Sequence, residues 1–319
     1  AGFRAPEEGL GSGLLARDGL VYYTDIPNLW RFADTDGDGR ADAQVALHAG
    51  FGVRTSLYGH DMHGLVWGPD DRLYWTIGDR GYHVRTREGH VLAAGGAGAA
   101  FRCEPDGSNL EVFYYGLRNP QELAFDAAGR LFTVDNNSDA GDRARITYLL
   151  EGGDTGWNMR YQTLGGDNTR GPWSQERLWH VAHSNQPAWI VPPVAHLTSG
   201  PSGLAFDPGC LPAPWQGGFL ICDFRGGSSG SSVTWFQLAP QGAGFALGRH
   251  APLLSDVLAT DVEFAPDHRI FVSDWINGWS AEGQGRMLVL QPTNEADRAD
   301  GRRVADLLRT GFAGRTDAD

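Results

Sequence analysis

The chain has 319 residues, among them 45 Gly and 17 Pro, and 41% of its residues are hydrophobic. Glycine costs about 1 kcal/mol relative to alanine inside a helix, so this composition disfavours a helical bundle and favours a turn-rich β architecture. The net charge of −13 disfavours a phosphate-backbone partner, and we expect no nucleic-acid binding. All 26 basic residues are Arg, which excludes lysine chemistry such as Schiff-base formation.

No stretch approaches the roughly 18 apolar residues of a spanning helix, so the sequence predicts no direct membrane span. It shows no signal peptide and does not begin with Met, and we expect a mature or trimmed piece of a protein. The three cysteines show neither CxxC nor CxxCH spacing, which excludes a covalently attached c-type haem on this chain. Cys210 and Cys222 either form a disulfide or, like Cys103, are small buried residues.

A repeated pattern organises the chain. Each copy has an apolar strand, a polar turn with Asp or Gly, a second apolar strand and a final Asp. The copies are SGLLARDGLVYYTD (12–25), HGLVWGPDDRLYWTIGD (63–79), QELAFDAAGRLFTVD (121–135), SGLAFDPGCLPAPWQGGFLICD (202–223) and TDVEFAPDHRIFVSD (260–274). Alternating apolar residues and turn chemistry make each copy a β-hairpin.

Repeated hairpins, followed by further strand-like runs such as AAFRCEP and SSVTWFQL, are typical of propeller blades. We predict an all-β fold, a six-bladed β-propeller over 1–293 with five blades visible in the sequence. Segment 155–198, rich in Trp, Pro and His, is expected to form loops over one face, and a sixth blade to lie upstream or be shared between the termini. Residues 294–319 are expected to form a helical exit toward a missing module.

An acidic motif, DTDGDGRAD, occupies 34–42. Asp34, Asp36 and Asp38 alternate along the chain, Gly39 follows, and Asp42 stands where a ninth-position ligand would be, as in the first half of a Ca²⁺ loop. The bidentate Glu of an EF-hand is missing, since its position holds Val45. The motif predicts a weak Ca²⁺ site, and the alternative is an acidic hairpin turn.

Two histidines flank an Asp in GHDMHG (59–64), just before the second repeat. Histidine can act as a base or a metal ligand near neutral pH. His60 and His63 are three residues apart, which on a strand places them on opposite faces and disfavours a shared metal. Each is therefore either a catalytic histidine or a hydrogen-bonded structural residue.

Two further polar segments surround the third repeat. GLRNPQELAFD (116–126) places Arg118 and Asn119 at a strand entrance, where a guanidinium and an amide can bind oxygens of a ligand or pin a loop. DNNSDAGDRAR (135–145) follows the hairpin, and its carboxylates either hold Ca²⁺ or cap a polar turn. The candidate Ca²⁺ ligands in that segment are Asp135, Asp139 and Asp142.

The fourth and fifth repeats end in CDFRGG (222–227) and SDWINGW (273–279). Arg225 and Trp275 each follow the final Asp of their hairpin. Because their places in the repeat are equivalent, both are expected to face the same rim or channel. With His60, Arg118 and Asn119 they would form a polar pocket with one stacking wall, suited to a sugar or a planar quinone, or else a structural plug.

At these motifs the sequence resembles the soluble quinoprotein glucose dehydrogenase and aldose sugar dehydrogenase family. The blocks that carry the resemblance are HDMHGLVWGPDDRLYWTIGDRG (60–81), GLRNPQELAFD (116–126) and DRARITYLLEGGDTGWN (142–158). It is still more similar to the propeller of large bacterial proteins classed as membrane-bound dehydrogenases, which also carry helical repeats and a c-type haem domain. The resemblance implies the quinone cofactor PQQ, Ca²⁺, a sugar or alcohol substrate and a periplasmic or extracellular location.

By motif position the resemblance makes His60 the base that removes the substrate hydroxyl proton, with His63 as its rival. It makes Arg118 and Asn119 contacts of PQQ, Arg225 a further PQQ contact, and 135–142 a Ca²⁺ loop. The family also places two arginines just before the last hairpin, whereas LATDVEF (258–264) has none. A trianionic cofactor should therefore bind more weakly here.

Two hypotheses of function follow. The first is a PQQ- and Ca²⁺-type sugar or alcohol dehydrogenase that passes electrons to a c-type cytochrome domain or another subunit. The second is a propeller without cofactor that serves as a scaffold or binding subunit of a larger complex, and a glycan hydrolase or lyase is a third, weaker reading. The missing arginine pair separates the first two, since fold alone does not decide function.

Overall fold

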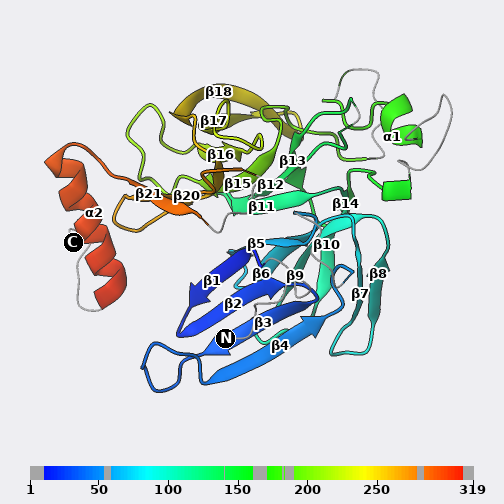
Figure 1. The fold of residues 1–319 in the computed structure, drawn as a ribbon, viewed down its shortest axis with the longest axis horizontal. Helices are drawn as coiled ribbons and strands as arrows, with labels where there is room; N and C mark the ends of the chain where they lie inside the picture. The colour runs from blue at the N-terminus through cyan, green and yellow to red at the C-terminus, as the bar shows by residue number, and fades with distance from the viewer. Residues whose placement is uncertain are drawn as a thin grey trace. The chain divides into compact units, whose positions relative to one another are not determined.

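The computed structural model describes residues 11–53, 59–139, 141–160, 171–181, 183, 190–278 and 284–311. Strands dominate these residues, and the all-β prediction is confirmed (Figure 1). Internal contacts divide the chain into two units. Unit 1 comprises Ala1–Pro201 with Pro240–Ala246, and unit 2 comprises Ser202–Ala239 with Leu247–Asp319.

Unit 1 contains three blade sheets whose strands follow one another mainly as antiparallel meanders. The first sheet has the order β1-β2-β3-β4, the second β14-β10-β9-β6-β5 and the third β11-β12-β13. A separate hairpin, β7-β8, is inserted between the inner and outer halves of the second sheet. The strands are β1 Gly13–Arg17, β2 Leu20–Asp25, β3 Asn28–Ala33, β4 Ala43–Ala49, β5 Met62–Trp67, β6 Leu73–Ile77, β7 Tyr82–Arg85, β8 Val91–Ala94, β9 Gly98–Cys103, β10 Glu111–Leu117, β11 Pro120–Phe125, β12 Leu131–Asp135, β13 Arg145–Leu149 and β14 Gly153–Asp154.

The other two blade sheets have the orders β15-β16-β17-β18 and β19-β20-β21. Their strands are β15 Pro201–Phe206, β16 Phe219–Asp223, β17 Ser232–Gln241, β18 Gly244–Ser255, β19 Ala259–Phe264, β20 Ile270–Asp274 and β21 Arg286–Leu290. With unit 1 this makes five propeller blades, one for each predicted repeat. Within the described ranges the one remaining sheet is the β7-β8 hairpin, so no sixth blade is seen there.

Outside the blades, the structure describes two helices, α1 (Gly171–Gln175) and α2 (Glu295–Thr310). The described part of 155–198 holds α1, turns and a single bridge residue, Ala195, and no four-stranded sheet, as expected for an insertion of loops. The three cysteines are free thiols, so Cys210 and Cys222 do not form a disulfide. None of the described helices is long and apolar enough to cross a membrane.

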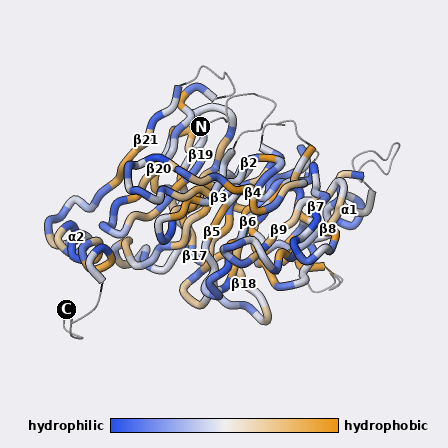
Figure 2. The backbone as a smooth tube through the Cα atoms, turned by 90° about the horizontal axis from the view of Figure 1, so that it is seen from below, coloured by the Kyte–Doolittle hydropathy of each residue, from blue (hydrophilic) through white to orange (hydrophobic). Residues whose placement is uncertain are grey.

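The distribution of apolar residues along the strands explains where the buried cores form. Apolar residues concentrate on the strands and hydrophilic residues on the connections between them (Figure 2). In unit 1 Trp75 stacks on Phe101 with ring centroids 5.6 Å apart, and Phe51 meets both edge-on. All three side chains are fully shielded from solvent, and aromatic packing of this kind adds to the area that they bury.

The final Asp of each repeat occupies an equivalent place in its blade. Four of these residues end the second strand, and Asp79 lies two positions beyond the end of β6. All five are at most 3% exposed; they are Asp25, Asp79, Asp135, Asp223 and Asp274. The predicted equivalence of the repeat aspartates is therefore confirmed.

Helix α2 lies in the segment that was expected to be helical. Asn294 caps its N-terminus, accepting from the Asp297 N–H at 2.9 Å. Its one buried residue is Gly301, where a Cβ atom would lie 2.3 Å from the carbonyl oxygen of Asp267, in the turn between β19 and β20. The missing side chain thus allows the helix to contact that turn.

We expect Gly301→Ala to loosen α2, although alanine normally favours a helix by about 1 kcal/mol over glycine. The added methyl group would collide with backbone rather than with a flexible side chain. Hydrogen exchange over 295–310 should become faster. Arg303→Ala, at an exposed position of the same helix, is the matched control and should leave exchange unchanged or slower. Equal exchange in Gly301→Ala and the parent would contradict this docking contact.

Candidate functional site

His60 forms a hydrogen-bonded pair with a buried carboxylate. Its Nδ1 lies 2.8 Å from Oδ1 of Asp79, and the other carboxylate oxygen accepts the indole N–H of Trp157 at 3.1 Å. Asp79 and Trp157 are 1% and 2% exposed, whereas the His60 side chain keeps 16% of its surface in solvent. An Nδ1–H that donates to the carboxylate leaves Nε2 with its lone pair, as in a general base held by an acid.

A glycine makes this pair possible. A Cβ atom on Gly78 would lie 2.6 Å from the carbonyl oxygen of His60, so the two backbones pass too closely for any other residue. The Gly78 N–H donates to the carbonyl oxygen of Asp61 at 3.1 Å. Asp79 is thereby held against the segment that carries His60.

His63 has a different environment. Its Nε2 lies 2.9 Å from the carbonyl oxygen of Gly59 and its Nδ1 lies 2.8 Å from the hydroxyl of Ser12. Burial lowers the pKa of His63 to about 4, which keeps the ring neutral. Both of its nitrogens are engaged inside the protein, and the geometry therefore favours His60 over His63 as the base.

Arg118 and Asn119 lie beside the His60 pair. The carbonyl oxygen of Arg118 accepts the N–H of Asp79 at 2.7 Å, so the predicted site residues of the second and third blades meet at this backbone contact. Both side chains are largely buried, at 7% and 3% exposure. The Arg118 Nε and the Asn119 Oδ1 are buried without a hydrogen-bond partner in the structure, which marks them as polar atoms available to a ligand.

Asp135 fixes the backbone of these two residues. Its carboxylate accepts the N–H of Arg118 at 3.1 and 3.2 Å and the N–H of Asn119 at 2.7 Å. It also pairs with the guanidinium of Arg145, and neither side chain has any solvent exposure. Arg145 in turn lies over the ring of Trp173, 4.4 Å from its centroid.

The carboxylates predicted to hold Ca²⁺ at 135–142 make several contacts inside the protein. Asp135 is committed to Arg145 and two backbone donors, and Asp142 accepts from the backbone N–H and hydroxyl of Ser138 and from the Trp173 indole at 3.1 Å. Asp139 is 83% exposed and lies 3.8 Å from Arg118. Asp135 and Asp142 thus accept internal donors, as in Asx-type turn capping, and the Ca²⁺ loop stays a prediction.

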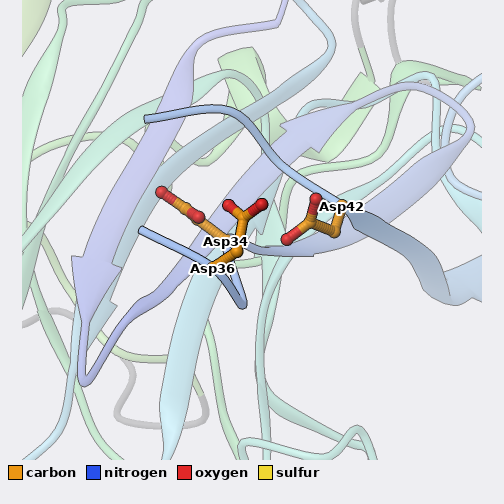
Figure 3. Close-up of side chains that lie close together, drawn as sticks. All are labelled: Asp34, Asp36 and Asp42. Carbon is orange, nitrogen blue, oxygen red and sulfur yellow. The ribbon is translucent and has the colours of Figure 1, made fainter. Parts of the chain in front are cut away.

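The first acidic motif does bring three carboxylates together. Oxygens of Asp34, Asp36 and Asp42, in the loop between β3 and β4, lie within 4.8 Å of one another (Figure 3). Asp38 is not a member of this group, and its carboxylate accepts the Arg40 N–H of its own turn at 2.8 Å. Thr35 donates its N–H and its hydroxyl to Asp42, which lowers the pKa of that carboxyl and keeps it ionised.

Arg225 and Trp275 both belong to unit 2. The Arg225 side chain is 49% exposed and its NH2 group lies 2.8 Å from the buried Asp223 carboxylate. Trp275 lies beside Phe224, with ring centroids 5.6 Å apart. The backbone N–H of Trp275 donates to the carbonyl oxygen of Leu258 at 3.0 Å. Within this unit the residues thus form an aromatic pair next to an ion pair.

The stretch that lacks the expected arginines forms β19. It carries Asp261 and Glu263, two residues apart and so on one face of the strand. Both residues keep an exposed surface, yet the protein atoms around them desolvate their carboxyl groups. This desolvation raises the pKa of Asp261 to about 6, and desolvation followed by the charge of Asp261 raises that of Glu263 to about 7. Carboxyl groups, not guanidinium groups, therefore line this face.

The sequence patterns missed Asp79, Trp157 and Arg145 as site residues. Asp79 was recognised only as a repeat position, and the separation of 78 residues between it and Trp157 leaves no local signal. What distinguishes Asp79 from the other repeat aspartates is its basic partner. Among the ion pairs of the described residues, Asp79 pairs with a histidine, whereas Asp135, Asp223 and Asp274 pair with arginines.

Comparison with known proteins places this geometry in context. The family described as Domain of unknown function (DUF7133) matches residues 10–304. Quinoprotein glucose dehydrogenase B of Acinetobacter calcoaceticus is 29% identical over 124 residues, which is 31% of this chain and 26% of that protein. The chain therefore matches about a quarter of the length of this relative.

Two solved structures share the fold over most of the chain. A Thermus thermophilus protein assigned as an oxidoreductase (glucose dehydrogenase) has 20% identity and a TM-score of 0.62, covering 90% of this chain and 85% of its own. The PQQ-bound aldose sugar dehydrogenase of Streptomyces coelicolor has 20% identity and a TM-score of 0.57, covering 88% of this chain and 80% of its own. At this identity the likeness shows the fold.

Asp135→Ala is expected to destabilise the protein by about 3–5 kcal/mol, because it leaves the Arg145 charge buried and unpaired. Asp223→Ala removes the equivalent repeat Asp from a pair whose arginine is half exposed, and it should cost clearly less. Urea unfolding of the parent and both variants measures the difference. Equal losses would show that burial of the arginine does not set the cost.

Calorimetry should detect Ca²⁺ binding at the β3–β4 loop, in the range of about 10⁻⁴–10⁻³ M that suits a site with few ligands. Asp36→Ala should abolish the signal, and Asp38→Ala should keep most of it, because Asp38 lies outside the group of three. A parent protein that gives no heat at millimolar Ca²⁺ would rule the site out.

Proposed function

We propose that the chain, which belongs to the family described as Domain of unknown function (DUF7133), is a PQQ-dependent dehydrogenase of a sugar or alcohol. The single observation that carries the proposal is the His60–Asp79 pair, a partly exposed imidazole held by a buried carboxylate at 2.8 Å. Two of the matched proteins are named as a quinoprotein and a PQQ-bound sugar dehydrogenase. That chemistry is extended here to this chain.

The residues of unit 1 fit the polar edge of a quinone. Arg118 and Asn119 each hold a buried polar atom without a hydrogen-bond partner, next to the backbone of Asp79. When bound, PQQ would supply a quinone that takes up two electrons from the substrate. Arg118 would donate to its oxygens, and Asn119 would accept or donate according to the orientation of its amide.

His60 performs the proton transfer in this proposal. The hydroxyl proton of the substrate would pass to Nε2. A bound quinone would supply the two-electron acceptor for the carbon-bound hydrogen, so that an alcohol becomes a carbonyl compound. Asp79 holds the ring in the required tautomer and stabilises the imidazolium that forms. The Trp157 indole keeps the second oxygen of Asp79 satisfied, which fixes the carboxylate plane.

The proposal assigns Ca²⁺ at 135–142 no role in the reaction, since Asp135 and Asp142 accept internal donors. The carboxyl pair of β19, in place of two arginines, adds no positive charge for a trianionic cofactor. The proposal therefore includes weak cofactor binding. The same feature favours the second candidate function, a propeller that binds no cofactor and serves as a scaffold or binding subunit.

The resemblance described above extends the proposal to the cellular setting. We place the reaction on the periplasmic or extracellular side. Electrons would pass to a c-type cytochrome domain or another protein subunit, because a two-electron carrier must be reoxidised for turnover.

Reconstitution of the full chain with PQQ and Ca²⁺ tests the proposal. We expect a change in PQQ absorbance on binding and dye reduction with at least one member of a panel of aldoses and alcohols. His60→Ala should lower kcat by about 10²–10⁴-fold, the usual contribution of a general base, without abolishing the PQQ absorbance change. His90→Ala, at an exposed position between β7 and β8, is the matched control and should keep full activity.

Two outcomes would contradict the proposal. A parent protein that leaves the PQQ spectrum unchanged at saturating cofactor would support the scaffold function. Binding and turnover that are unchanged in His60→Ala would keep the dehydrogenase and remove His60 as its base.

A further inference from the structure

Three histidine side chains gather in unit 1, in a region that the proposed reaction does not use. The ring centroid of His180 lies 6.2 Å from that of His183 and 6.3 Å from that of His196. The indole ring of Trp179 contacts His180 and His196, with centroids 5.6 and 6.0 Å away. The possible ligand atoms of this group are imidazole nitrogens, whereas those of the Asp34 loop are carboxylate oxygens.

His196 follows a segment that is hydrogen-bonded to β13, the edge strand of the third blade. Backbone hydrogen bonds join Val194 and Ala195 to Ile146 of β13, at 2.8 and 2.9 Å. On the other side His180 follows α1 in a series of turns, and its N–H donates to the carbonyl oxygen of Arg177 at 2.9 Å. One histidine thus sits on a sheet edge and the other on a more adaptable turn.

Both rings are oriented by backbone carbonyls. The Nδ1 of His196 lies 2.8 Å from the carbonyl oxygen of Ala144, and the Nδ1 of His180 lies 2.9 Å from that of Val181. A carbonyl can only accept, so each Nδ1 carries the proton and each Nε2 carries the lone pair. The same arrangement orients the histidine ligands of metal ions, where the second ring nitrogen donates to a carbonyl or carboxylate.

One of these lone pairs is buried without a partner. The Nε2 of His196 has essentially no solvent contact and no hydrogen-bond partner in the structure. Two arginines, Arg143 and Arg145, lie close enough to act on this ring electrostatically. The charge of Arg145 is balanced by Asp135, which reduces its repulsion of a cation.

We propose that His180, His183 and His196 bind one divalent transition-metal ion of the zinc class, leaving a fourth coordination position open. Imidazole nitrogens are suitable ligands for zinc, copper and nickel, and three of them with an open position form a recognised type of zinc site. This inference is independent of the proposed dehydrogenase activity.

The ring separations are slightly longer than those of a formed site. With zinc–nitrogen distances of about 2.0–2.1 Å, two imidazole centroids ligated at a tetrahedral angle lie roughly 5–5.5 Å apart, and the observed separations are 6.2 and 6.3 Å. The three rings do not yet bring their nitrogens within 4.8 Å of one another, as the Asp34 group does with its oxygens. Metal binding must therefore draw the rings together, and His180, on its turn, is the residue that we expect to move.

Cobalt(II) is the probe for the experiment, because it replaces zinc and absorbs visible light when bound by three nitrogens in a near-tetrahedral site. The full chain is treated with a chelator, dialysed and titrated with Co²⁺ alone. We expect one equivalent to give visible d–d bands that added Zn²⁺ abolishes. Zn²⁺ should also raise the melting temperature, as any ligand of the native state does.

Two variants localise the ion. His196→Asn keeps a side-chain N–H that can donate to the Ala144 carbonyl but removes the Nε2 lone pair, so the fold is retained while Co²⁺ affinity falls at least tenfold. His180→Ala should cause a similar loss. His90→Ala, at an exposed position in the same unit, is the matched control and should bind as the parent does.

The proposal is overturned if the parent shows no d–d bands with excess Co²⁺. It is also overturned if His196→Asn and His180→Ala bind Co²⁺ with parental affinity, which would assign the signal to exposed histidines elsewhere. The melting temperature without metal, measured for every variant, separates loss of the site from loss of the fold.

Discussion

The pairing of the buried aspartate that follows or ends the second strand is the interaction on which each blade depends. In the third and fifth blades it pairs with an arginine that opens the following strand, Arg145 for Asp135 and Arg286 for Asp274. In the fourth blade the partner is Arg225, two residues after its Asp. A carboxylate without solvent needs a charged or hydrogen-bonding partner, so the choice of partner decides what each blade end can do. In the second blade that partner is His60, whose imidazole carries a second ring nitrogen that faces away from the carboxylate bond.

The blades were predictable because their signals are local. Alternating apolar residues and Asp/Gly turns lie within about 15–20 residues of each repeat, and the five sheets follow them. The β7-β8 hairpin inserted into the second blade could not be foreseen, since a further hairpin has the same local pattern as a blade strand pair. In the described residues the third and fifth blades each have three paired strands instead of four. This difference depends on pairing between distant segments and could not be predicted from any one segment.

The candidate site was predictable only in part. His60, Arg118 and Asn119 stand in short motifs, and the structure brings them together around Asp79. The carboxylates of 135–142 have the composition of a metal loop, yet Asp135 forms an ion pair with Arg145 and Asp142 accepts a hydrogen bond from Trp173. Trp173 lies 31 residues from Asp142, so this donor cannot be recognised from the motif itself. In the Asp34 loop, Asp42 rather than Asp38 completes the group because turn capping engages Asp38.

The equivalence of the repeat aspartates has a consequence for how activity can arise in such a fold. Every blade contains a buried carboxylate at an equivalent place, but its partner comes from a different part of the chain in different blades. His60 precedes β5, Arg145 and Arg286 open the strand that follows the Asp, and Arg225 lies two residues after it. A designer could therefore add an Asp-bound imidazole to another blade by placing a histidine ahead of its first strand, without rebuilding the arginine pair already there.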